Sequence, residues 1–212
     1  MRQAALTFLL CLSLAGKVFA QAVSCAPNSP ERVGKPGCSI LGDVRLPGSV
    51  RGPVFWHIDE FGSLAGAQSA AGAASVAFSA HGAYWLATVE TDTLRHHGGR
   101  HRATIGPIPL QAGTRYSMQV MSAYMLPGQM STIHTHSGPE VWYVLEGEQC
   151  LQTTTGTVKA HAGQGAMVAG GDTMRLVVTG STARRSLVLV LHDSERPASS
   201  IIDSLIEMRS CQ

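Results

Sequence analysis

The sequence predicts an all-β protein built as a double-sheet jelly roll, and three observations carry that prediction. Short apolar runs recur along the chain and are separated by glycine-containing turns, as expected for many short strands. Glycine accounts for 23 of the 212 residues and charged residues for only 14%, which suits a β protein with many turns and argues against disorder. One set of histidine and glutamate side chains also has a spacing that suits strands. The length is enough for one domain with a sizeable core.

The first twenty residues predict a secretory signal peptide. Arg2 supplies a positive start, and residues 6–15 form an apolar run that is too short to span a bilayer. Small residues favour cleavage near Ala20 or Ala22, so we expect a periplasmic or secreted protein. Without this segment 14 of the 16 basic residues remain against 14 acidic ones. This balance offers no attraction for nucleic acid or for an anionic membrane surface.

Export permits disulfides among Cys25, Cys38, Cys150 and Cys211, and four cysteines allow three complete pairings. We favour Cys25–Cys38 because both lie in a Pro/Gly-rich stretch that has few apolar residues. Closing that loop contributes about 3 kcal/mol in the chain-entropy model. Cys150 lies in a strand pattern, and it is either a buried free thiol or the partner of Cys211.

Alternating or continuous apolar patterns identify the expected strands after residue 52. The pattern over residues 185–192, RSLVLVLH, is nearly continuous, as expected for a strand buried on both faces. A turn at 80–82 is expected to join two of the strands as a hairpin. The predicted strands cover residues 53–61, 74–79, 83–89, 114–126, 141–145, 149–154, 174–178 and 185–192.

Two short helices and one loop are expected beside these strands. Ser63 is a good N-cap for an alanine-rich segment that ends at residue 73. Residues 199–208 place isoleucine and leucine at helical spacing and predict an amphipathic C-terminal helix. The basic residues between 95 and 102 predict a solvated loop, and His57 is expected on the surface of its strand.

The most informative segment is GQMSTIHTHSGPEVWYVLEG, from Gly128 to Gly147. His134 and His136 are one residue apart, so on a strand they point to the same face, roughly 6.6 Å apart. The turn sequence at residues 137–139 lets Glu140 open the next strand and return a carboxylate to that face. This set predicts a metal site.

The spacing G-x5-H-x-H-x3-E-x6-G resembles the first conserved motif of the cupin superfamily. The resemblance implies a double-stranded β-helix, or jelly-roll cupin barrel, with extra N-terminal strands and short flanking helices. Only one copy of the motif is present, which indicates a monocupin, and the family makes a homodimer plausible. The expected organisation is a signal peptide over residues 1–20, a Pro/Gly-rich extension over 21–52, the cupin domain over 53–195, and a C-terminal helix or tail over 196–212.

The second cupin motif, G-x5-P-x-G-x2-H-x3-N, is degenerate in this chain. Aligned from Gly163, it places Ala169 at the proline, Gly171 at the glycine, Met174 at the histidine and Val178 at the asparagine. The third imidazole ligand of the family is therefore replaced by methionine. The resemblance extends to cupin-like bacterial proteins of unassigned function that carry a methionine here.

Three interpretations of Met174 remain open. If it does not bind metal, the two histidines and one carboxylate form a facial triad suited to non-haem iron. If its thioether binds, a soft ligand joins the set and copper is favoured. Alternatively it fills the barrel floor, which is the usual role of methionine. Zinc, nickel and manganese remain alternatives for the cation, and His161 or His192 could replace the missing imidazole.

Strand alternation also predicts which neighbours face the cavity. Trp142 shares the parity of Glu140 and is expected to point inward, whereas Tyr143 should point away. Gln129 and Met130 precede the ligands and are expected to line the mouth.

Two functions from different classes follow. The first is an exported metal-dependent oxidoreductase, resembling a dioxygenase, that acts on a small molecule at open positions of the metal. The second is a non-enzymatic cupin module that binds a small ligand or a metal. A sugar-phosphate isomerase is less favoured, because no basic residue lies between residues 129 and 151 to hold an anion.

Overall fold

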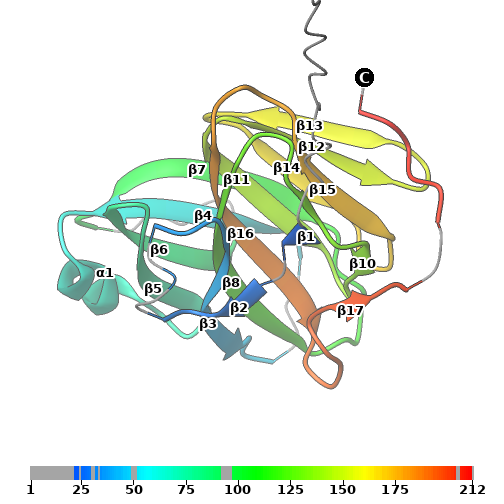
Figure 1. Ribbon diagram of the computed structural model, residues 1–212. Coiled ribbons are helices and arrows are strands. Elements are labelled where there is room, and N and C mark those ends of the chain that lie inside the picture. Colours follow the sequence, from blue (N-terminus) through cyan, green and yellow to red (C-terminus); the bar gives the residue numbers. More distant parts are fainter. Residues whose placement is uncertain are drawn as a thin grey trace, which may run out of the picture.

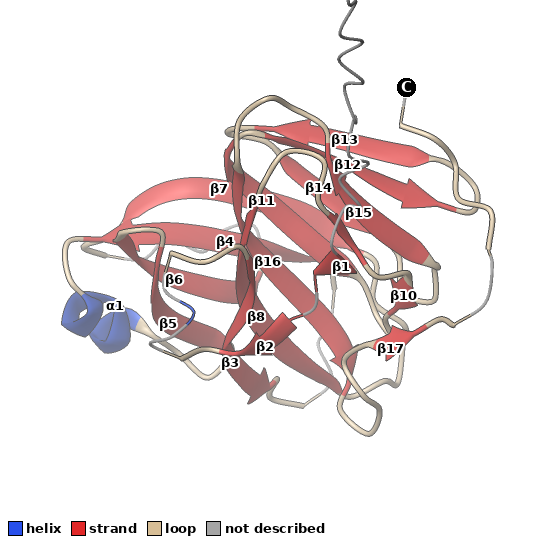
Figure 2. Cartoon of the chain, viewed as in Figure 1, coloured by secondary structure: helices blue, strands red, loops and turns tan. Residues whose placement is uncertain are grey.

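The described residues form three β-sheets, and the central one of the three contributes to two separate apolar cores (Figures 1 and 2). The computed structural model describes residues 22–23, 25–29, 32, 34–48, 52–91, 97–203 and 206–211. The predicted signal peptide lies outside these residues. Within them, no helix is long and apolar enough to cross a membrane.

The central sheet has every internal pair antiparallel except one. The exception is the pair of β2 (Cys25–Pro27) and β3 (Gly37–Arg45), which run parallel. β16 (Arg184–Asp193) lies between two neighbours and is buried along nearly its whole length, which confirms the strand predicted to be buried on both faces. In order, the sheet is β14 (Gly165–Val168), β11 (Glu140–Glu146), β16, β8 (Tyr116–Met125), β3 and β2.

A second sheet covers the inner face of the central sheet and completes a double-stranded β-helix barrel. An apolar cluster between the two sheets contains Trp142, Leu151, Met174 and Val188. The all-β jelly-roll prediction is therefore confirmed. The second sheet consists of β1 (Ala22–Val23), β9 (Met130–Ser131), β15 (Met174–Val178), β10 (His134–Thr135), β17 (Ser200–Ile201), β12 (Glu148–Thr153) and β13 (Thr157–His161).

A third sheet packs on the outer face of the central sheet (Figure 1). Trp56, Ile58 and Trp85 from this sheet meet Val141 and Leu189 from the central sheet in one buried cluster. The third sheet has the order β5 (Ser75–Ala80), β6 (Ala83–Glu90), β4 (Val54–Phe61) and β7 (Arg100–Ile108).

The predicted helix and hairpin of this region are confirmed. The Ser63 hydroxyl accepts a hydrogen bond from the backbone N–H of Gly66, and α1 (Leu64–Ala70) begins there. His81 and Gly82 join β5 to β6 with φ of 53° and 77°. Two consecutive residues with positive φ match the twist of the strands that they connect.

The prediction of a C-terminal helix over residues 199–208 is wrong. Ser200–Ile201 is instead strand β17, paired with β10, and residues 206–210 form no helix. The isoleucine spacing satisfies a helical period, but pairing with β10 decides the local conformation. Ser204 and Leu205 lie outside the described residues.

Two expectations about polar residues are also corrected. His57 is buried, 1% exposed, because β4 lies between β6 and β7, and its ring contacts the Thr91 carbonyl and the Thr104 hydroxyl. The basic stretch becomes strand β7 from residue 100 onward, and Arg100 and Arg102 both donate to the Glu60 carboxylate. Residues 95 and 96 lie outside the described residues.

The predicted domain boundary at residue 53 lies between β3 of the central sheet and β4 of the outer sheet. β3 lies before it and pairs with β8 along the central sheet. Strands β4 to β7 lie after it, yet they form the separate outer sheet. Long-range strand pairing, rather than composition, therefore decides which segments make the barrel.

All four cysteines that follow the predicted signal peptide form disulfides. Cys25 bonds to Cys38, as favoured, and Cys150 bonds to Cys211. The second bond ties the C-terminal segment to β12, where the N–H of Arg209 also donates to the Thr153 carbonyl.

Substituting Gly138 tests a close contact between the turn that precedes β11 and strand β16. A Cβ atom there would lie 1.9 Å from the Leu191 carbonyl oxygen, so Gly138→Ala should lower the free energy of unfolding by about 3 kcal/mol, as overpacking does. Gly156 has open space around it, so Gly156→Ala should change that free energy by less than about 0.5 kcal/mol. Denaturant unfolding measures both, and equal losses would contradict the proposed clash.

Candidate metal centre

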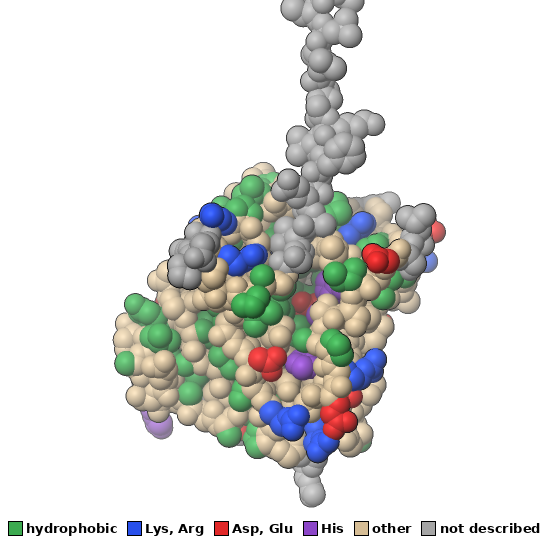
Figure 3. All heavy atoms as spheres, turned by 60° about the horizontal axis from the view of Figure 1, so that its bottom comes forward, with side chains coloured by type: hydrophobic (Ala, Val, Ile, Leu, Met, Phe, Trp, Pro, Cys, Tyr) green, Lys and Arg blue, Asp and Glu red, His purple; other side chains and the backbone are tan. Residues whose placement is uncertain are grey.

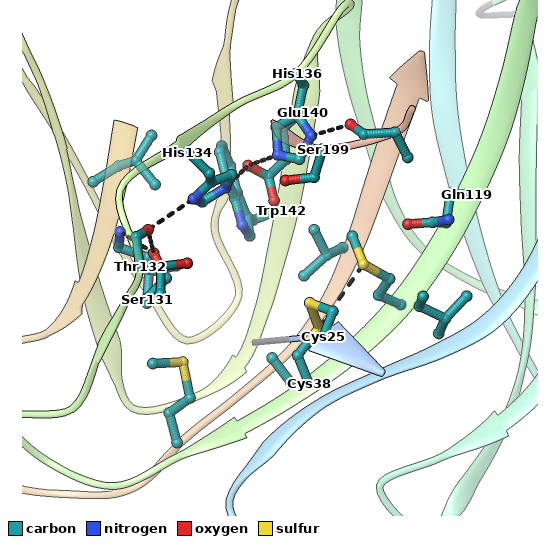
Figure 4. Close-up of a pocket in the computed structure, with 18 of the residues that line it drawn as sticks. Cys25, Cys38, Gln119, Ser131, Thr132, His134, His136, Glu140, Trp142 and Ser199 are labelled. Atoms are coloured by element: carbon teal, nitrogen blue, oxygen red, sulfur yellow. Dashed lines mark hydrogen bonds and ion pairs between the residues drawn. A yellow bond between two sulfur atoms is a disulfide. The ribbon is translucent and has the colours of Figure 1, made fainter. Parts of the chain in front are cut away.

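His134, His136 and Glu140 converge on one point of the barrel wall (Figure 4). β10 carries His134, the following turn carries His136, and Glu140 opens β11. One ligand atom from each residue lies within 4.8 Å of the others. The Glu140 Oε2 atom is 3.2 Å from His136 Nε2 and 3.8 Å from His134 Nε2. The structure therefore brings together three of the four predicted ligands.

Backbone carbonyls fix the orientation of both imidazole rings. His134 Nδ1 lies 2.9 Å from the Thr132 carbonyl oxygen, and His136 Nδ1 contacts the carbonyl of Ala198. A carbonyl only accepts, so Nδ1 carries the hydrogen and Nε2 of the neutral ring keeps its lone pair for a cation. Partners of this kind orient metal-binding histidines in proteins.

The two cupin motifs meet behind His136. The backbone N–H of Gly171 donates to the His136 carbonyl oxygen at 2.9 Å. A Cβ atom on Gly170 would lie 2.5 Å from the Gly138 Cα atom, so the two turns pack with almost no space between them. The degenerate second motif therefore keeps the backbone part of its role although it lacks the histidine.

The site contains buried polar atoms with no hydrogen-bond partner. His136 Nε2 and Glu140 Oε2 are both buried in this way, and Glu140 Oε2 is joined to the two imidazoles only by contacts at ion-pair distance. Leaving such atoms unpaired is costly in a protein interior. A lone pair on nitrogen and a carboxylate oxygen are ligands that divalent transition metals accept, so the residues fit a cation.

The metal-free site is electrostatically coupled. Burial alone would lower the pKa of His136, but the Glu140 carboxylate outweighs it and the pKa is raised. Burial alone would raise the pKa of Glu140, but the adjacent histidines lower it to about 2. Glu140 is thus a carboxylate, not a carboxylic acid, at neutral pH.

Met174 lies beside the trio but does not line the cavity. It is fully buried in the barrel's apolar cluster, and it is paired with His134 in the β10–β15 ladder. His161 is exposed on β13, and His192 Nε2 lies 3.6 Å from Asp43 Oδ2. Among the described residues neither histidine joins the cluster of ligand atoms.

The trio faces a cavity of about 340 Å³ between the two barrel sheets, the size of a small-molecule site. Trp142 lines this cavity and Tyr143 lies in the outer core, as the strand alternation predicted. Ser131 and Thr132, rather than Gln129 and Met130, line the site near the ligands. Histidine and acidic side chains are visible at the middle of the face in Figure 3.

The cavity includes groups that sequence reasoning missed. The Cys25–Cys38 disulfide forms part of its wall (Figure 4). Arg184 and the segment just before β17, with Ala198 and Ser199, reach it from late in the chain. No local spacing signals these contacts, because each depends on strand pairing across the barrel.

Comparisons with known proteins give no match to the sequence and only low-scoring matches to the structure. No family model and no curated protein matches the sequence. An oxalate oxidase in complex with the substrate analogue glycolate is 17% identical, covers 40% of this chain and 46% of its own, and has a TM-score of 0.35. The match thus spans less than half of that oxidase.

Two further solved structures are similar at the same level. An uncharacterised protein with a double-stranded β-helix domain from Klebsiella pneumoniae is 18% identical over 46% of this chain and 82% of its own, with a TM-score of 0.36. A polyketide cyclase from Streptomyces resistomycificus is 22% identical over 40% of this chain and 60% of the cyclase, with a TM-score of 0.35. At such scores no function is inferred from these matches. The barrel and the motif on its inner wall give this chain a cupin fold.

The pKa shifts predict how pH acts on the metal-free protein. The raised pKa of His136 means that its stabilisation is present below 6.5 and is lost as pH rises through the folded pKa. The lowered pKa of Glu140 means that its stabilisation is present above 4.5 and is lost as pH falls toward about 2.

Thermal unfolding of chelator-treated protein should therefore show greatest stability between these limits, relative to Glu140→Gln, which removes the charge pair. His161→Gln is the matched control, since His161 is exposed and outside the cluster, and its profile should follow that of the wild type. A Glu140→Gln profile parallel to the wild type would contradict the coupling.

Proposed function

We propose that this chain is an exported, metal-dependent oxidoreductase of the cupin type, acting on a small molecule held in the barrel cavity. The observation that carries the proposal is the set of three converging ligand atoms in the wall of a cavity, with both imidazoles oriented by carbonyls. Two histidines and one carboxylate with open positions suit non-haem iron. A homodimer and the signal peptide stay predictions.

His134, His136 and Glu140 would hold the cation, which when bound would supply open positions for a substrate or oxygen. Glu140 then serves as a ligand and not as a general base. The apolar walls, including Trp142 and Leu151, would exclude water and hold the body of the substrate. Thr132 and Ala198 would keep both imidazoles in the tautomer that binds.

Two facts about Met174 favour packing over ligation. Its side chain is fully buried among apolar residues, and it is absent from the cavity lining. A thioether ligand would instead favour copper, so the identity of the cation and the role of this residue are linked.

His134→Ala is expected to abolish tight metal binding, because it removes one of three ligands. Elemental mass spectrometry of protein exported to an oxidising compartment and purified without chelator measures the metal content. His161→Ala should retain the wild-type content, since His161 is exposed and lies outside the cluster. Equal metal content in His134→Ala and the wild type would sink the site assignment.

Met174→Leu separates packing from ligation. If Met174 only packs, the variant keeps stoichiometric metal, and its free energy of unfolding falls by less than about 1.5 kcal/mol, as for volume-conserving core substitutions. If the Met174 sulfur is a ligand, Met174→Leu should contain less metal than the wild type and should lose any preference for copper. Met174→His should strengthen zinc or nickel binding by restoring an imidazole.

A non-enzymatic binding module is the second candidate. The observation that favours it is that Glu140 is the only carboxylate among the described residues that line the cavity, so no separate acid or base stands near the ligands. Oxygen consumption by metal-loaded protein, screened over small organic substrates, distinguishes the two. Metal-dependent turnover supports the oxidoreductase, whereas absence of metal even after reloading supports the binding module.

A further inference from the structure

A second functional group lies at the opposite end of the cavity from the histidines. Arg184 begins β16, is 1% exposed and lines the same cavity. Its Nε donates to Gln149 Oε1 at 2.6 Å, and its Nη1 contacts Met125 Sδ at 3.6 Å. Its Nη2 has no partner. Among the described residues no carboxylate lies within ion-pair distance of this guanidinium.

Two more unpartnered polar groups lie near Arg184. Gln149 Nε2 is buried without a hydrogen-bond partner, and the bond from Arg184 to Gln149 Oε1 fixes that amide with its donor nitrogen free. Ser186, two residues further along β16 and on the same face, has a buried hydroxyl with no partner. Guanidinium, amide and hydroxyl all supply hydrogen-bond donors, which is what an anion requires.

A buried cation without a counter-ion is unfavourable, and a packed apolar side chain would be as good for stability. Burial lowers the pKa of Arg184 to about 9, although Glu140 acts in the opposite direction. The group still carries its charge at neutral pH. Stability alone therefore gives no reason for this residue, whereas a ligand that completes its hydrogen bonds would.

We propose that Arg184, held by its hydrogen bond to Gln149, binds the carboxylate of an organic acid whose other end reaches the metal centre. The inference rests on the proposed function and names the substrate class of that same cavity. Guanidinium groups suit carboxylates because they match the anion in plane and charge.

The shape of the cavity sets the form of this acid. Glu140 is paired with Val190, six residues along β16 from Arg184, yet the side chains of Glu140 and Arg184 approach closely enough for the Glu140 charge to act on the guanidinium. The two side chains extend into the space between and shorten it. Apolar residues line this space, namely Met121, Ala123, Leu151, Leu176 and Val188, so the body of the ligand is hydrocarbon-like.

The charge of the site favours a monoanionic carboxylate over a phosphate dianion. One guanidinium compensates one negative charge, and the Glu140 carboxylate, the other charged group of the cavity, would repel a second. The ligand class is therefore an elongated acid with a carboxylate at one end and its reactive group at the other.

Calorimetric titration with hexanoate and with 1-hexanol tests the carboxylate site, because the two probes share an apolar body. The wild type should bind hexanoate at least about tenfold more tightly than 1-hexanol, the size expected for hydrogen bonds to a charged group. Arg184→Met should remove that preference. Arg185→Gln is the matched control, since Arg185 is partly exposed, pairs with Glu146 and lies over Tyr124, and it should keep the preference.

The titrations are run on protein as purified and after chelator treatment, which separates this inference from the proposed function. A preference that survives chelation and disappears in Arg184→Met supports the carboxylate site even if no metal is found. A preference that requires metal and is insensitive to Arg184→Met places the carboxylate on the cation and overturns the inference. A wild type that does not discriminate overturns it as well.

Thermal unfolding without ligand tests whether Arg184 has a purely structural role. The inference expects Arg184→Met to unfold at the wild-type temperature or above, because an unpaired buried charge is removed. If that variant does not fold, Arg184→Lys decides. It keeps the charge but loses the fork of donors, so hexanoate affinity between that of the wild type and that of 1-hexanol supports the site, and wild-type affinity for both probes overturns it.

Discussion

Burial of the central sheet on both faces is the constraint on which the rest of the structure depends. Side chains alternate along β11, so Glu140 and Trp142 enter the cavity while Val141 and Tyr143 enter the outer core. A shift of one residue in register would place an apolar residue at the metal centre and a carboxylate in the outer core. Packing in both cores therefore fixes the register of β11 and with it the position of Glu140. The outer sheet contributes to the site in this indirect way.

The candidate metal centre is organised mainly by backbone groups. The carbonyls of Thr132 and Ala198 orient the imidazoles, and the N–H of Gly171 holds the turn that carries His136. Because these partners are main-chain atoms, the orientation of both imidazoles does not depend on the side chain at position 174.

The cavity has opposite chemistry at its two ends. One end has a carboxylate and two imidazoles for a cation, and the other has a guanidinium with free donors for an anion. Apolar side chains and the Cys25–Cys38 disulfide separate them. A disulfide in this wall is compatible with an oxidising compartment. An elongated acid is the kind of molecule that would satisfy both ends at once, whether the protein transforms it or only binds it.

The sequence by itself determined the features that depend on neighbouring residues. It placed the ligand trio, the capped helix at Ser63, the hairpin and the Cys25–Cys38 bond, because spacing and turn chemistry act over short distances. Only the tertiary structure decided the features that depend on strand pairing across the barrel. Residues 199–208 have a helical spacing of apolar side chains, but β17 within them pairs with β10. His57 is buried because its strand lies between two others. Arg184 lines the cavity although it is far along the chain from the ligands. Local patterns carry no information about which distant strand will cover a given face, so these contacts follow from packing alone.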